Sequence, residues 1–154
     1  MMYIGLLAIS MLSCRTDAPE TPRAGSFRWK IYTSQGGGYT LIYPDIYTYE
    51  ELYDGDTVHF FYGDRVVIMV HYTTTQAPNN DGLWFGESPV KSIQLGNQNG
   101  QLYDHIHTDG VFGTRTLSYV ITHNNHYLAL EFKTDNETLN SVQEKTLLSF
   151  DLLY

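Results

Sequence analysis

Two histidines separated by one residue, His105 and His107, have the clearest potential for metal chemistry in this sequence. Side chains two positions apart on a β-strand share a face, so both imidazoles could ligate one metal ion. Asp104 and Asp109 lie nearby, and the segment His123–His126 offers two further imidazoles. A closed zinc site needs four ligands, however, and no third ligand follows at a recognisable spacing. Solvated histidines near a strand end explain the same pattern, so a metal-dependent enzyme is the third of three functional hypotheses.

Aromatic residues suggest a second kind of chemistry, the binding of sugars or of a partner protein. Trp84 and Phe85 stand together in a polar stretch, and the chain contains thirteen tyrosines. Exposed aromatic rings on a β scaffold can stack on sugar rings or grip a partner. Half-buried strand residues, with Trp84 and Phe85 closing the edge of the core, are the alternative. The tyrosines considered with this pair are Tyr43, Tyr47, Tyr49, Tyr53 and Tyr62.

Four carboxylates, Glu50, Glu51, Asp54 and Asp56, offer oxygen ligands for calcium, but their spacing is not that of an EF-hand. A solvated loop is the preferred interpretation. The sequence also contains no nucleophile elbow, Walker loop, dinucleotide fingerprint or His-Glu-x-x-His motif. It therefore gives no positive reason to predict an enzyme or a bound cofactor.

The N-terminal residues indicate where the protein resides. The apolar run Tyr3–Leu12 is too short for a membrane-spanning helix of about 20 residues, but it has the length of a signal-peptide core. The next residues, Ser13 and Cys14, resemble a bacterial lipobox, although Met11 replaces the usual leucine and no basic residue precedes the run. The alternative is a buried N-terminal strand with an incidental cysteine.

We therefore predict a lipoprotein signal peptide at residues 1–13 and a lipid on Cys14, the single cysteine of the chain. A polar, proline-containing tether is expected at 14–25, because such a composition buries little apolar surface. The remaining residues, 26–154, have the length of one globular domain. The formal net charge is −8 and the basic residues are scattered, which argues against nucleic acid as a partner.

The last forty residues give the clearest structural prediction. Strands are expected at Leu117–Thr122 and Tyr127–Phe132, joined by a tight turn at Asn124-Asn125. Thr134 to Glu137 fits a capping box, which predicts a helix from about Glu137 to Phe150. One apolar stripe of this helix should face the core, formed by Leu139, Val142, Thr146, Leu147 and Phe150.

Earlier segments predict further hairpins. Thr57–Tyr62 and Arg65–Tyr72 flank Gly63-Asp64, and the apolar run Val66–Val70 predicts a central strand covered on both faces. The acidic stretch from Ile46 to Asp56 is expected to be a connector with at most a helical turn. Other strands are expected at 26–32, 39–43, 90–95 and 101–107, with a turn at 96–100 and a polar excursion at 73–87.

Two segments carry a resemblance to a known family. Gly38–Asp45 resembles the "GF-x-hydrophobic-x-YP" opening of PsbP-like proteins, with Tyr39 in place of the usual phenylalanine. Tyr127–Phe132 followed by Glu144–Phe150 is similar to that family's closing strand and "ILSSF" ending. The resemblance implies an α+β sandwich whose central antiparallel sheet has about six to eight strands, with the C-terminal helix packed on one face. It also implies an accessory or binding role, but the family's photosystem partner does not transfer.

Together these features predict an exported, lipid-anchored, non-catalytic accessory protein of the bacterial cell envelope. Its expected contacts are the membrane, through the lipid on Cys14, and another envelope protein. The alternative is a surface lipoprotein that binds carbohydrate or another ligand around Trp84 and Phe85. The metal site at His105 and His107 remains the third hypothesis.

Overall fold

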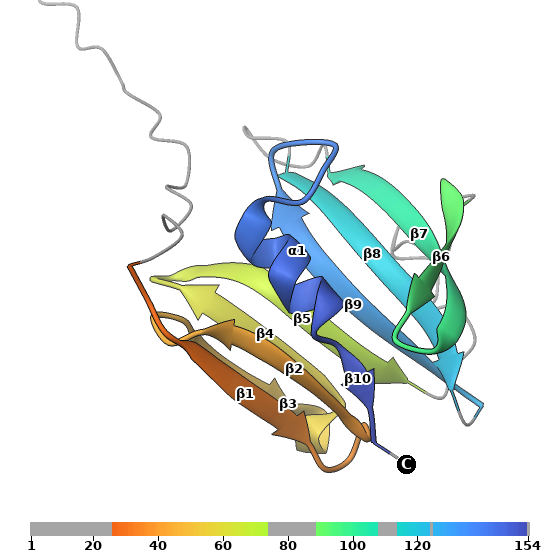
Figure 1. Cartoon of the computed structure of the whole chain (residues 1–154), viewed down its shortest axis with the longest axis horizontal. Helices are drawn as coiled ribbons and strands as arrows, with labels where there is room; N and C mark the ends of the chain where they lie inside the picture. Colours follow the sequence, from red (N-terminus) through yellow and green to blue (C-terminus); the bar gives the residue numbers. More distant parts are fainter. Residues whose placement is uncertain (1–25, 74–88, 108–113, 124, 154) are drawn as a thin grey trace, which may run out of the picture.

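The computed structural model describes residues 26–73, 89–107, 114–123 and 125–153, which form two packed layers (Figure 1). The larger layer is a seven-stranded antiparallel sheet in the order β3-β4-β5-β9-β8-β7-β6. The smaller layer is the sheet β1-β2-β10, with helix α1 in contact with β2. The bounds are β1 Trp29–Ser34, β2 Tyr39–Pro44, β3 Thr48–Leu52, β4 Thr57–Tyr62, β5 Arg65–Thr73, β6 Lys91–Leu95, β7 Gln98–His107, β8 Thr114–His123, β9 His126–Thr134, α1 Ser141–Leu148 and β10 Asp151–Leu152. This architecture confirms the predicted fold class.

The core lies between the two layers. The strands of the large sheet turn alternate residues to opposite faces, and the inner face, toward α1, is apolar. Tyr39 and Leu41 of β2 pack against it from the small sheet, each 1% exposed. The fully buried side chains that the large sheet contributes are Val58, Phe60, Ile68, Val70, Ile121, Leu128, Leu130 and Phe132.

The predicted hairpins are present. β4 and β5 are joined at Gly63-Asp64, where Gly63 has φ 64°. β8 and β9 pair as far as His123 and His126, and Asn125 before β9 has φ 61°, a conformation that asparagine tolerates well. The covering of β5 differs from the prediction, because Ile68 and Val70 are buried on one face while Val67, Met69 and His71 on the other are half-buried.

The helix begins later than the sequence predicts. Helix α1 starts at Ser141 rather than Glu137, because Asn140 forms the capping box. The Asn140 side-chain oxygen accepts hydrogen bonds from the backbone N–H groups of Val142 and Gln143, each at 2.9 Å. The Gln143 side-chain oxygen accepts the Asn140 N–H at 3.1 Å. The helix ends at Leu148, and Phe150 is a core residue beyond it.

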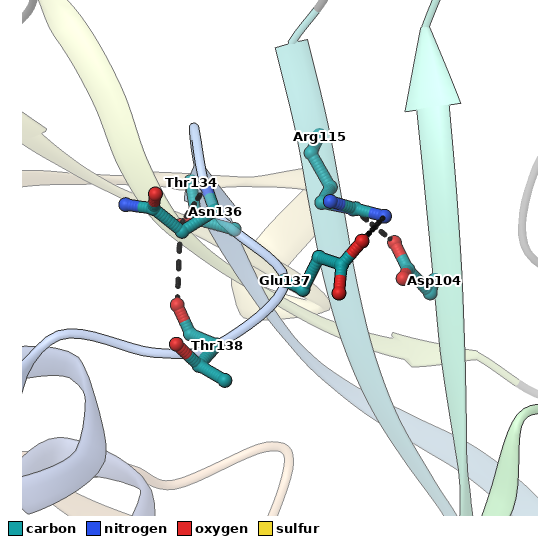
Figure 2. A network of polar contacts seen from close by, with 6 residues as sticks. All are labelled: Asp104, Arg115, Thr134, Asn136, Glu137 and Thr138. Carbon is teal, nitrogen blue, oxygen red and sulfur yellow. Dashed lines mark hydrogen bonds and ion pairs between the residues drawn. The ribbon is translucent and has the colours of Figure 1, made fainter.

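The segment predicted as the capping box anchors a connector instead (Figure 2). Thr134 ends β9, and its hydroxyl accepts the Asn136 N–H at 3.1 Å. Glu137 reaches Arg115 of β8, with Oε1 3.6 Å from Nη2. Arg115 also donates from Nε to Asp104 Oδ1 at 2.7 Å. The connector between β9 and α1 is thereby tied to strands β7 and β8.

One strand and one turn were not predicted correctly. The acidic connector contains the edge strand β3, which was not predicted. The helical turn that the sequence allowed there is a 3₁₀ turn at Tyr53–Gly55, where Tyr53 and Asp54 have positive φ. Glu51 of β3 accepts a hydrogen bond from the Tyr32 hydroxyl at 2.7 Å, which links the two layers. The turn between β6 and β7 is shorter than expected, because Leu95 already pairs with Gln98. None of the described helices is long and apolar enough to cross a membrane.

Candidate functional site

A group of polar and titratable side chains lies on the face of the seven-stranded sheet that turns away from α1, here called the outer face. Strand alternation places these residues there, because each neighbours a core residue whose side chain points inward. His59 precedes the buried Phe60, His71 follows the buried Val70, and Glu131 lies between Leu130 and Phe132. The outer-face cluster consists of Thr57 and His59 on β4, His71 on β5, Glu131 and Lys133 on β9, and Thr116 on β8.

His71 lies at the centre of this cluster. Its Nδ1 is 3.3 Å from the Thr57 hydroxyl, and its Nε2 is 4.0 Å from a carboxylate oxygen of Glu131. The His59 ring lies 6.2 Å from the His71 ring, centroid to centroid, at an interplanar angle of 76°. Thr57 pairs directly with His71 across β4 and β5, while Glu131 pairs with Met69 across β5 and β9. Three adjacent strands therefore fix the positions of these groups.

Burial keeps His71 neutral at physiological pH. It lowers the pKa of the imidazole to about 4, and the nearby His59 and Lys133 act in the same direction. The Glu131 carboxylate would favour the protonated ring, but at 4.0 Å it is at the limit of an ion pair and burial outweighs it. Burial also lowers the pKa of His59, against the opposing effect of Glu50. A neutral imidazole offers one donor and one acceptor nitrogen to a partner.

Lys133 connects the outer-face cluster to the other side of the sheet. Its ammonium donates a hydrogen bond to the Thr116 hydroxyl at 2.9 Å on the outer face. Its backbone carbonyl accepts a hydrogen bond from the Gln143 side chain of α1 at 2.7 Å. Gln143, which completes the capping box at the start of α1, thus also fixes the end of β9, and β9 carries Glu131 and Lys133.

Two of the residues singled out from the sequence border this cluster, because His105 pairs with Thr116 across β7 and β8, and Glu50 pairs with His59 across β3 and β4. His105 and His107 both lie on β7, but Asp104, which alternates to the other face, pairs with Arg115. Within the described part of the chain, no three histidine, cysteine, aspartate or glutamate side chains gather as a metal site would require. The His107 side chain and Asp109 lie outside that part, as do Cys14, Trp84 and Phe85.

The histidines of the β8–β9 hairpin and the acidic residues of β3 form no metal site in the described part of the chain. His123 and His126 pair at the end of the β8–β9 hairpin, and the His126 ring stacks on Tyr72 at 4.4 Å and 2°. Glu50 and Glu51 are neighbours on β3 and so point to opposite faces, which does not form a calcium-binding loop.

Sequence reasoning missed the outer-face cluster. The available signal was a charged residue inside an apolar strand, because Glu131 interrupts the run from Leu128 to Phe132. Glu131 is 3% exposed in the folded chain. Buried charges are rare unless they have a partner, so this residue could have marked the site.

Comparisons with known proteins identify the fold. No family model matches this sequence, and no curated protein matches it. The solution structure of cyanobacterial PsbP (CyanoP) from Synechocystis sp. PCC 6803 is similar with a TM-score of 0.57 and 13% identity, covering 86% of this chain and 96% of that one. A crystal structure from Bacteroides thetaiotaomicron VPI-5482 is similar with a TM-score of 0.59 and 9% identity over 81% of this chain. It covers 48% of that protein, so this chain spans about half of its length. The chain has a PsbP-like fold.

Proposed function

We propose that this protein is a lipid-anchored, non-catalytic accessory protein of the bacterial cell envelope, and that it binds another envelope protein through the outer-face cluster. The observation that carries the proposal is the set of half-buried groups His59, His71 and Lys133 on the central strands of a rigid sheet. They combine neutral imidazoles with a cation, beside the buried carboxylate of Glu131. Such a surface suits hydrogen bonding to a polar segment of a partner.

The spacing within the cluster favours binding over catalysis. Thr57, His71 and Glu131 have the residue types of a nucleophile, a base and an orienting carboxylate. A working relay needs hydrogen bonds of about 2.6–3.2 Å between successive members. The two separations here are 3.3 Å and 4.0 Å, and Thr57 is only 9% exposed. The threonine hydroxyl is therefore poorly placed to attack a substrate, whereas the half-buried imidazoles remain available for contact.

Site-specific photocrosslinking in intact cells tests the proposed surface. A benzophenone amino acid replaces His59 or Lys133, both half-buried on the outer face, and replaces Leu148 of α1 in the control. We expect the two cluster positions to give crosslinked species of the same mass, because both lie on one binding surface, and the Leu148 position not to give that species. Absence of a common adduct at His59 and Lys133, or the same adduct at Leu148, would contradict the proposal.

The lipid anchor is tested by metabolic labelling with a clickable palmitate. We expect the wild-type chain to be labelled and Cys14→Ser to lose the label, because Cys14 is the single cysteine and follows a small residue as in a lipobox. Ser13→Ala keeps a small residue before Cys14 and serves as the matched control, which should remain labelled. Equal labelling of the wild type and Cys14→Ser would exclude the anchor.

A further inference from the structure

The outward surface of the smaller layer exposes apolar side chains. Ile31 of β1 is 73% exposed and Leu148 of α1 is 78% exposed. Ile31 pairs directly with Ile42 of β2, while Tyr32 and Leu41, the next pair along, point into the core. Strand alternation therefore directs Ile31 and Ile42 away from the core.

Exposed and half-buried residues of the two strands and of the helix form one continuous surface. The Lys145 ammonium lies 4.5 Å above the centre of the Trp29 ring, which connects α1 to the start of β1. Leu148 follows Lys145 by three positions and so shares its side of the helix. The Ser149 hydroxyl accepts the Ile42 N–H at 2.9 Å, which fixes the end of the helix against β2. The residues Trp29, Ile31, Ile42, Lys145 and Leu148 are called the anchor-side face below.

This combination of residues suits the interfacial zone of a bilayer. Tryptophan and lysine both present a long apolar body and a polar end, which places them at the boundary between acyl chains and headgroups. Arg28 at the entry to β1 is exposed, although it is 3.5 Å from the carboxylate of Asp45. Lys30 is also exposed, but it pairs with the buried Tyr43 and so points to the other face of β1 from Ile31. Surfaces that join apolar side chains to lysine and arginine bind reversibly to membranes.

The proposed lipid would hold this face close to a membrane. Ser26 lies twelve residues after Cys14, and Figure 1 shows that the chain enters the domain at β1, whose first residue is Trp29. A chain of twelve residues reaches at most about 40 Å. A surface tethered over such a distance has an effective concentration on the order of millimolar, so weak contacts are sufficient for docking.

We propose that the anchor-side face lies against the lipid bilayer. This inference rests on the proposed anchor at Cys14 and extends it to the orientation of the domain. The anchor-side face and the outer-face cluster lie on opposite sides of the two-layered domain, since the core separates the layers. Docking therefore directs His59, His71 and Lys133 away from the membrane, toward a partner.

The test uses the full-length lipoprotein reconstituted in vesicles of phosphatidylethanolamine and phosphatidylglycerol. A bimane fluorophore is attached to a cysteine introduced by Ile31→Cys or Leu148→Cys, and a small fraction of the lipids carries a nitroxide near the headgroup. Gln101→Cys is the matched control, because Gln101 is exposed but pairs with Val120 on the outer face of the large sheet. We expect quenching at Ile31 and Leu148 to be severalfold stronger than at Gln101.

Vesicle flotation separates this inference from the anchor itself. A protein that floats with the vesicles but is quenched equally at Ile31, Leu148 and Gln101 overturns the orientation and leaves the anchor intact. A full-length protein that does not float overturns the anchor and with it the docking. A double variant, Ile31→Asp with Leu148→Asp, should still float but lose the excess quenching of a fluorophore on Ile42→Cys. Unchanged quenching in that variant would also contradict docking through this face.

Discussion

Phe60→Ala is expected to lower the free energy of unfolding by about 3–5 kcal/mol, the usual cost of removing a buried phenylalanine ring. Phe60 of β4 is 0% exposed and contacts rings from both layers of the sandwich. Its ring centre lies 5.0 Å from that of Tyr43, 5.5 Å from that of Tyr32 and 5.9 Å from that of Tyr49. Truncation would open a cavity between β4 and the small sheet, and the neighbouring rings could move to fill only part of it.

Urea denaturation followed by circular dichroism measures this effect, since the midpoint and slope give the free energy of unfolding. Phe61→Ala is the matched control, because Phe61 is the next residue, is half-buried and follows a β-bulge in the same strand. We expect it to cost about 1 kcal/mol, as for an average substitution. Equal losses for the two variants would show that Phe60 does not join the layers.

The predictable parts of the fold depend on short stretches of sequence. Gly63-Asp64 and Asn124-Asn125 lie between apolar runs, and residues that accept positive φ are sufficient to specify such turns. Alternation in 57–62 and 127–132 likewise defines a strand with one buried face. In these segments the local preference and the tertiary structure agree, so the hairpins β4–β5 and β8–β9 could be predicted from sequence.

The start of the helix shows where local patterns are insufficient. The sequence contains two possible capping boxes, Thr134 with Glu137 and Asn140 with Gln143. Thr134 pairs with Arg115 at the end of β9, so its backbone is committed to the sheet and cannot cap a helix. The Glu137 side chain forms an ion pair with Arg115 and does not cap a helix. The choice between the two boxes is therefore made by the length of the β8–β9 pairing, which no local motif reveals.

The outer-face cluster was less predictable still. His71 and Glu131 are sixty residues apart and approach each other only because β5 pairs with β9, Met69 opposite Glu131. A shift of one residue in that register would turn Glu131 into the apolar core. The sequence could have identified Glu131 as unusual for a buried strand, but its neighbours follow from the strand order alone.

Acidification from pH 7 to about 4 is expected to destabilise the protein through His71. The imidazole titrates near pH 6.5 when unfolded, whereas burial beside Lys133 and His59 lowers its pKa in the folded chain to about 4. Between these two pH values the unfolded state binds more protons than the folded state. The contribution of His71 to the free energy of unfolding is therefore fully present above about pH 6.5 and is lost as the pH falls. Glu131, 4.0 Å from the ring, opposes the effect. The loss through this one residue is up to about 3 kcal/mol, since each pKa unit corresponds to about 1.36 kcal/mol.

The measurement is the free energy of unfolding at several pH values between 5 and 7, where most carboxylates stay ionised and histidines dominate the slope. His71→Asn provides the comparison, because asparagine does not titrate and its side-chain oxygen can replace Nδ1 beside Thr57. The variant should lose less stability than the wild type over this range, whatever its stability at pH 7. A parallel pH dependence in both proteins would mean that His71 takes up its proton as readily when folded as when unfolded. In that case the outer-face cluster would hold an imidazolium beside Glu131 only at mildly acidic pH, below about 6.5, where an unperturbed histidine is mostly protonated.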